Sequence, residues 1–137
     1  MTTMEIPQGA SPEDLKVRKK IIGDFYANWC AEHPDKKVWN ESLHAYIHIK
    51  YQSLNETRGQ ASVSYESTKA VLRLTEILEK ATVAKVKPIK KNDQNQKAYD
   101  RMIFMYYNGI RLLVRHQPSK DEYVQYCITA KKASLGR

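Results

Sequence analysis

In the last third of the chain, aromatic residues that include Tyr106 precede the dipeptide Asn108-Gly109, and two arginines, Arg111 and Arg115, follow it. Asn-Gly between two apolar runs is typical of a two-residue β-hairpin, because both central residues of a type I′ turn need a positive φ. The resulting register places Tyr106, Arg111 and Arg115 on one face of the hairpin. Guanidinium groups bind phosphate oxygens, and aromatic rings stack on unpaired bases. The pattern predicts a cradle for a phosphodiester; a solvated face on which the arginine stems cover apolar residues is the alternative.

A third strand is expected to extend this face after a turn at 118–121. Val124, Tyr126 and Ile128 are apolar at alternate positions, so we expect them to face the core. The residues between them then lie beside the two arginines, and they are Tyr123, Gln125, Cys127 and Thr129.

Charge is distributed unevenly along the chain. The chain has 23 Lys and Arg against 15 Asp and Glu, a net charge of +8, and residues 81–137 carry the whole excess. Four lysines without an intervening acid fall in one short stretch, at Lys85, Lys87, Lys90 and Lys91. Such a basic half indicates a polyanionic partner. Lysines on an edge strand also prevent aggregation, which is the alternative explanation for Lys85 and Lys87.

Few residues suit acid–base or metal chemistry. His44 and His48 have the i,i+4 spacing of metal ligands only if their segment is helical, and no HExxH motif surrounds them, so we expect no metal. His48 and His116 are candidate acid–base groups on strands. Glu56 is a candidate base, or it stabilises the start of a helix. The absence of nucleotide-binding and hydrolase motifs predicts no cofactor.

Helical and alternating patterns predict an α+β fold, in which an N-terminal helix is followed by a strand, two helices and a four-strand antiparallel segment that ends in a three-strand meander. Ser11 and Pro12 begin the first helix, whose apolar stripe includes Ile22 and Trp29. The region 36–51 is ambiguous, because a helix entering at Asn40 competes with a strand at 44–51. The expected elements are helices at 12–32, 53–60 and 64–81, and strands at 44–51, 82–87, 102–107, 110–116 and 123–129.

Length and composition predict one domain over 1–137. We expect a flexible N-terminus at 1–10, a helical extension at 11–43, a core at 44–130 and a flexible tail at 131–137. The apolar runs are only a few residues long, which favours a cytoplasmic protein without membrane contact. The helix at 12–32 is a candidate surface for self-association or a protein partner.

Three segments carry a family resemblance: 53–62, the helix at 67–81, and 114–129 with the sequence QYCITA at 125–130. Together, over 44–130, they resemble the small barnase/EndoU/colicin/RelE-type ribonuclease-like domains found in polyvalent proteins of phages and mobile elements. The resemblance implies a nuclease-derived site with Glu56 and Arg58 on a helix and Arg115, Gln125 and Thr129 on the last two strands. Gln60 stands where members often have a histidine. A binding module that has lost catalysis is therefore the alternative.

The leading hypothesis is a metal-independent ribonuclease-like protein of toxin or mobile-element type that binds RNA rather than DNA. Glu56 or His48 would accept the ribose 2′-hydroxyl proton, and arginines would stabilise the charge that develops on phosphorus. The alternative is a nucleic-acid or protein-binding module without chemistry. The predicted catalytic residues are Glu56, His48, Arg115, Gln125 and Thr129, and the predicted nucleic-acid-binding residues are Arg58, Lys85, Lys87, Lys90, Lys91, Tyr106, Arg111 and Tyr123.

Overall fold

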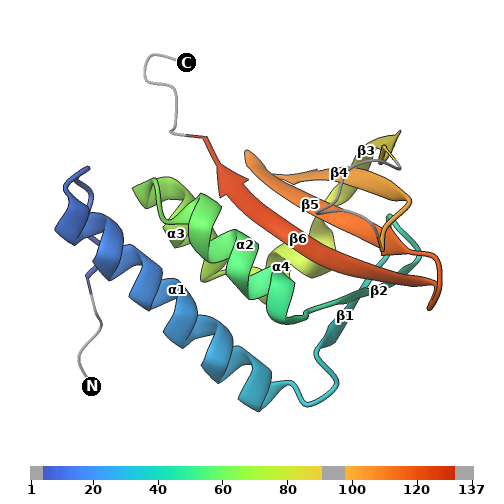
Figure 1. Ribbon diagram of the computed structural model, residues 1–137, viewed down its shortest axis with the longest axis horizontal. Helices are drawn as coiled ribbons and strands as arrows, with labels where there is room; N and C mark the ends of the chain where they lie inside the picture. Colours follow the sequence, from blue (N-terminus) through green and yellow to red (C-terminus); the bar gives the residue numbers. More distant parts are fainter. Residues whose placement is uncertain (1–4, 91–97, 132–137) are drawn as a thin grey trace.

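Four helices pack against a six-stranded sheet with the strand order β1-β2-β6-β5-β4-β3 (Figure 1). The structure, a computed structural model, describes residues 5–90 and 98–131. Lys91 and the outer parts of the two predicted flexible ends, 1–4 and 132–137, lie outside the described residues. The helices are α1 (Pro12–Glu32), α2 (Tyr51–Ala61), α3 (Tyr65–Val71) and α4 (Leu74–Lys80), and the strands are β1 (Lys37–Asn40), β2 (Ala45–His48), β3 (Thr82–Pro88), β4 (Arg101–Tyr107), β5 (Ile110–Gln117) and β6 (Glu122–Ala130).

The predicted α+β class is confirmed. The helix start at Ser11 and the hairpin turn at Asn108-Gly109 are also where the sequence predicted them. The Ser11 hydroxyl accepts a hydrogen bond from the Asp14 amide at 3.1 Å, so α1 begins at Pro12 as expected. Asn108 and Gly109 both have positive φ and join β4 to β5 with Tyr107 opposite Ile110. Strands β4, β5 and β6 form the predicted antiparallel meander.

Helix α1 belongs to the core of the domain. Its buried residues include Ile22, Tyr26 and Trp29, which pack with the other helices against one face of the sheet. The prediction that the apolar stripe of the first helix docks a partner is therefore wrong for Ile22 and Trp29, because both side chains are buried within this chain. The segment 11–43 is also not a purely helical extension, since it contains β1, which pairs with β2 in antiparallel register.

Two predicted boundaries differ from the observed ones for local reasons. The strand expected at 44–51 ends at His48, and Tyr51 begins α2, because the Ser53 hydroxyl accepts a hydrogen bond from the Lys50 amide at 3.0 Å. The single helix expected at 64–81 is divided at 72–73 into α3 and α4. This division lets α4 approach β1 and β5 while α3 follows β6.

One face of the sheet, which we call the helix face, packs against the helices. The opposite face, which we call the second face, carries the alternate residues of β4, β5 and β6. On the central strands the helix face includes Ile103, Met105, Leu112, Val114 and Ile128, and the second face includes Phe104, Tyr106, Arg111, Leu113, Cys127 and Thr129.

Strand β6 has two different kinds of neighbour along one edge. Strand β2 pairs with it in parallel at only two positions, opposite Tyr123 and Val124. Beyond them, α2 and α3 lie along β6 (Figure 1). Ser53 donates to the Gln125 carbonyl at 2.5 Å, and Ser67 both donates to the Ala130 carbonyl at 3.1 Å and accepts from its amide at 2.8 Å. Helix hydroxyls thus replace a neighbouring strand, which satisfies backbone groups that would otherwise be unpaired.

Glu76 joins α4 to β4, which gives a test by acid titration. Its carboxylate accepts hydrogen bonds from Arg73 at 2.6 Å and from the Tyr107 hydroxyl. These two donors lower the pKa of Glu76 from 4.5 to about 2. Because the folded-state pKa lies below the unfolded value, the carboxylate stabilises the fold above pH 4.5, and this stabilisation is lost as the pH falls toward 2.

We therefore expect Glu76→Gln to lower the melting temperature at pH 7, with a difference from the unaltered chain that shrinks between pH 4.5 and pH 2. Thermal melts followed by circular dichroism across this range measure the effect. Glu79→Gln, an exposed change on the same helix, is the control. A Glu76→Gln difference that does not change with pH would contradict the assignment.

Candidate nucleic-acid interface

Three side chains form a row across the second face. Tyr106 on β4 pairs with Arg111 on β5, and Arg111 pairs with Thr129 on β6. Together with Gly109 and Lys131, this row lines a pocket of about 470 Å³. Tyr106 is 45% exposed and Arg111 is exposed, so an aromatic ring and a guanidinium are accessible at the same place. This juxtaposition of Tyr106, Arg111 and Thr129 follows the register predicted from the sequence.

Two lysines of the edge strand β3 extend the cationic surface. Lys85 and Lys87 are exposed, and their ammonium groups lie 5.5 and 5.9 Å from the centre of the Phe104 ring. Phe104 lies two residues before Tyr106 on β4 and pairs with Leu113 on β5. Lys90, also exposed, follows the end of β3. The predicted lysines 85 and 87 therefore lie on the same face as Tyr106 and Arg111.

Arg115 lies deeper than expected. It is only 2% exposed, and its guanidinium is stacked between the rings of Tyr99 and Tyr126, at 3.9 and 4.1 Å from their centres. It also donates to the Gln52 side-chain oxygen at 2.8 Å, and the Tyr99 hydroxyl donates to the same oxygen at 2.9 Å. Burial lowers the pKa of Arg115, although Tyr99, Tyr126 and Glu56 oppose this shift.

Glu56 approaches this face from α2. Burial raises the pKa of the Cys127 thiol to about 11, while the Arg111 charge opposes the shift and the Glu56 charge adds to it. The same carboxylate acts on Arg115. Glu56 therefore acts electrostatically on Arg115, and Glu56 and Arg111 both act on Cys127.

Gln125 and Tyr123 do not join this group, which corrects their predicted position. A β-bulge between Leu113 and Val114 makes Gln125 pair with Val114, whose side chain is on the helix face. The Gln125 amide accepts from the Tyr26 hydroxyl at 2.7 Å and donates to Thr57 at 2.8 Å. It is fully buried there.

Tyr123 is also on the helix side, where its hydroxyl accepts a hydrogen bond from Arg101 at 3.0 Å. Its ring lies 4.8 Å from that of His116, whose two nitrogens face Asp100 and Asp121 at 2.8 Å. The second acid–base candidate of the sequence analysis, His116, is thus enclosed by structural contacts.

His48 and Arg58, the remaining predicted site residues on β2 and α2, lie away from the Tyr106 row. His48 is half-buried opposite Val124, 3.8 Å from Glu122; burial lowers its pKa, which Glu122 opposes and Lys50 reinforces. Its imidazole is therefore suited to accept a proton at neutral pH. Arg58 donates weakly to Asn55 at 3.4 Å and lies next to Gly23 of α1, so it is not part of this face.

Several residues of the second face could not be identified from the sequence. Gln52 and Tyr99 hold Arg115, but nothing in their local sequence indicates a contact with a strand distant in the chain. Trp39 and Tyr46 are exposed on β1 and β2, with their ring centres 5.2 Å apart and Lys37 over Tyr46 at 4.4 Å. The strand expected at 44–51 includes Tyr46, whereas β1, which carries Trp39, is only four residues long and was not expected.

Among residues 5–90 and 98–131, no three His, Cys, Asp or Glu side chains form a group that could hold a metal ion. Over the same residues, no helix has the length and apolar character needed to cross a membrane.

The fold and this surface define a small α+β domain with helices on one face of its sheet and a cationic, aromatic second face. The chain belongs to the family described as large polyvalent protein-associated domain 3, whose model matches residues 18–112. The polyvalent-protein part of the predicted resemblance is thus confirmed, whereas no comparison supports its ribonuclease-like part. No curated protein and no solved structure is significantly similar to the chain.

Replacing the two arginines should separate structural from surface roles. We expect Arg115→Ala to lower the free energy of unfolding by about 2 kcal/mol, because it empties the space between two rings and leaves Gln52 without this donor. Arg111→Ala, at an exposed position four residues earlier on the same strand, should change it by less than about 0.5 kcal/mol. Urea denaturation of both variants measures the difference, and equal effects would refute the distinction.

Proposed function

We propose that the second face of the sheet binds single-stranded RNA. The observation that carries the proposal is the row of Tyr106, Arg111 and Thr129, which opens into a pocket that Lys131 also lines. A guanidinium can donate two hydrogen bonds to one phosphate, and a neighbouring ring can stack on the attached base. The row therefore supplies the two contacts that a nucleotide of a single strand needs.

Electrostatics support a polyanionic ligand. Lys85 and Lys87 lie on the same face as Arg111, and the whole net charge of +8 resides in the half of the sequence that forms β3 to β6 and the residues around them. Lysines at a surface attract phosphates without regard to sequence and release counterions on binding. We therefore expect affinity that depends strongly on salt and weakly on base sequence.

Exposed rings favour a single strand over a duplex. Tyr106 lies on β4, and Trp39 and Tyr46 form a second aromatic group on β1 and β2. Bases that are paired and stacked in a duplex offer no free ring face, whereas unpaired bases do. RNA is preferred to DNA in this proposal because of the ribonuclease-like resemblance of 44–130.

Fluorescence anisotropy with a labelled 12-nucleotide RNA tests binding. Reversing two charges in Lys85→Glu/Lys87→Glu should weaken binding about tenfold at low salt and reduce the slope of log K against log salt by about 1.4. Lys16→Glu/Lys19→Glu, which makes the same charge change at exposed positions of α1, is the matched control and should have a smaller effect.

Single-stranded DNA and duplex RNA of the same sequence complete this experiment. Both should bind more weakly than single-stranded RNA. Equal losses in the two double variants would show that only net charge matters, and would refute the assignment to the second face.

RNA cleavage is a second candidate, favoured by the charge interaction between Glu56 and Arg115. Glu56 or His48 would remove the proton of a ribose 2′-hydroxyl as its oxygen attacks phosphorus. The 5′-oxygen would leave with a proton from a second acid or from water, which gives a 2′,3′-cyclic phosphate and a 5′-hydroxyl end. Gln125 is not part of this proposal, because its amide is buried and bonded on the helix face.

The cleavage candidate predicts that the chain cuts labelled RNA in the presence of EDTA. Glu56→Gln should lower the rate about a hundredfold if Glu56 is the base, with little change in melting temperature, because a half-buried carboxylate is replaced by a group of the same shape. Glu66→Gln, a half-buried change on α3, is the control. Intact RNA at micromolar protein, with normal binding, would leave binding as the function and exclude cleavage.

A further inference from the structure

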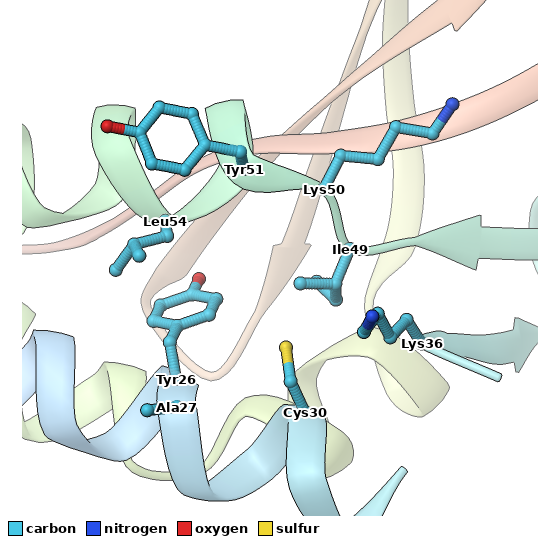
Figure 2. A pocket seen from close by; sticks show the side chains of 8 residues that line it. All are labelled: Tyr26, Ala27, Cys30, Lys36, Ile49, Lys50, Tyr51 and Leu54. Carbon is cyan, nitrogen blue, oxygen red and sulfur yellow. The ribbon is translucent and has the colours of Figure 1, made fainter. Parts of the chain in front are cut away.

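A second cavity lies between α1 and the beginning of α2, on the side of the molecule formed by the helices. Its volume is about 480 Å³, which is in the range of small-molecule sites. In Figure 2 the side chains of Cys30 and Ile49 point toward a common space beside the Tyr26 ring, and Leu54 also lines the cavity. The complete lining is Tyr26, Ala27, Cys30, Lys36, Ile49, Lys50, Tyr51 and Leu54.

Hydrogen bonds to residues outside the cavity hold its wall in place. The Tyr26 hydroxyl donates to the buried Gln125 amide, which in turn donates to Thr57 of α2. Ile49 is buried, and its amide donates to the Lys36 carbonyl at 2.8 Å. A ligand that enters would thus find apolar surface already in place, so binding would require little ordering of the protein.

The positive charge of the lysines that line the cavity favours apolar ligands that carry a negative group. The lining contains two lysines and no carboxylate. Lys50 donates to Glu122 at 2.6 Å and extends away from the cavity in Figure 2. Lys36 is exposed, and within the described parts of the chain no acidic side chain pairs with it. One ammonium group is therefore available beside an apolar hollow.

We propose that this cavity binds a small amphiphile with an acidic head group. The apolar part of the ligand would contact Ile49, Leu54 and the Tyr26 ring, and its carboxylate would pair with Lys36. The site shares no residue with the Tyr106 row and does not depend on RNA binding.

Cys30 provides a reporter inside the site. Its thiol points into the cavity, whereas the chain's other cysteine, Cys127, is buried with its pKa raised to about 11 and should react slowly. Alkylation by iodoacetamide, a neutral reagent, can be followed at each cysteine by peptide mass spectrometry. Octanoate at ten times its Kd should slow alkylation of Cys30 roughly tenfold, because only the unoccupied fraction reacts. Octylamine, with the same chain length and the opposite charge, should protect weakly.

Two variants make the assignment falsifiable. Lys36→Glu should weaken protection by octanoate about fivefold and strengthen protection by octylamine, since it reverses the charge at the rim. Leu54→Trp should remove protection by both probes, because the larger side chain projects into the cavity. Lys19→Glu, exposed on α1 outside the lining, is the charge control.

Circular dichroism melts of each variant check the fold, and Lys36→Glu carries the test alone if Leu54→Trp does not fold. Equal protection by octanoate and octylamine in the unaltered chain would overturn the acidic specificity. Absence of protection at millimolar octanoate, or protection that Lys36→Glu leaves unchanged, would overturn the site.

Discussion

The backbone of β6 imposes the constraint on which the rest of the domain depends. This strand is paired with β5 on one side, but β2 accompanies it on the other side for only two residues. Beyond that point, buried carbonyl and amide groups need other partners, because an unpaired buried group costs about 1–3 kcal/mol. Ser53, Thr57 and Ser67 supply them from α2 and α3. The helices must therefore lie against the strand edge, within hydrogen-bond distance of it.

That position gives the two sides of α2 different contacts. One side carries Ser53 and Thr57 to β6 and encloses Gln125, and the other carries Gln52 and Glu56 toward the second face. The bulge in the β5–β6 pairing has a related effect, because it turns Gln125 toward the helices while Tyr126 stacks on Arg115. A structural requirement of one strand thus determines which polar groups lie on the second face of the sheet.

The elements that local sequence determines were predictable, and those that depend on distant partners were not. Ser11 and Pro12 mark the start of α1, and Asn108-Gly109 marks a hairpin, because each works through its own backbone. The position of Tyr106 opposite Arg111, on the same face of the sheet, followed from that turn. In contrast, β1 is held by Asn40, whose amide donates to the Leu78 and Ala81 carbonyls. The bulge that displaced Gln125 likewise appears only when β5 and β6 pair.

The two arginines that the sequence treated as equivalent differ in how accessible their guanidinium groups are. Arg115 is occupied by Tyr99, Tyr126 and Gln52, so a phosphate could reach it only by displacing these partners. Arg111 is exposed beside Tyr106 and can meet a phosphate without such rearrangement. Binding needs only the accessible pair, whereas cleavage also needs a base correctly oriented on the bound strand.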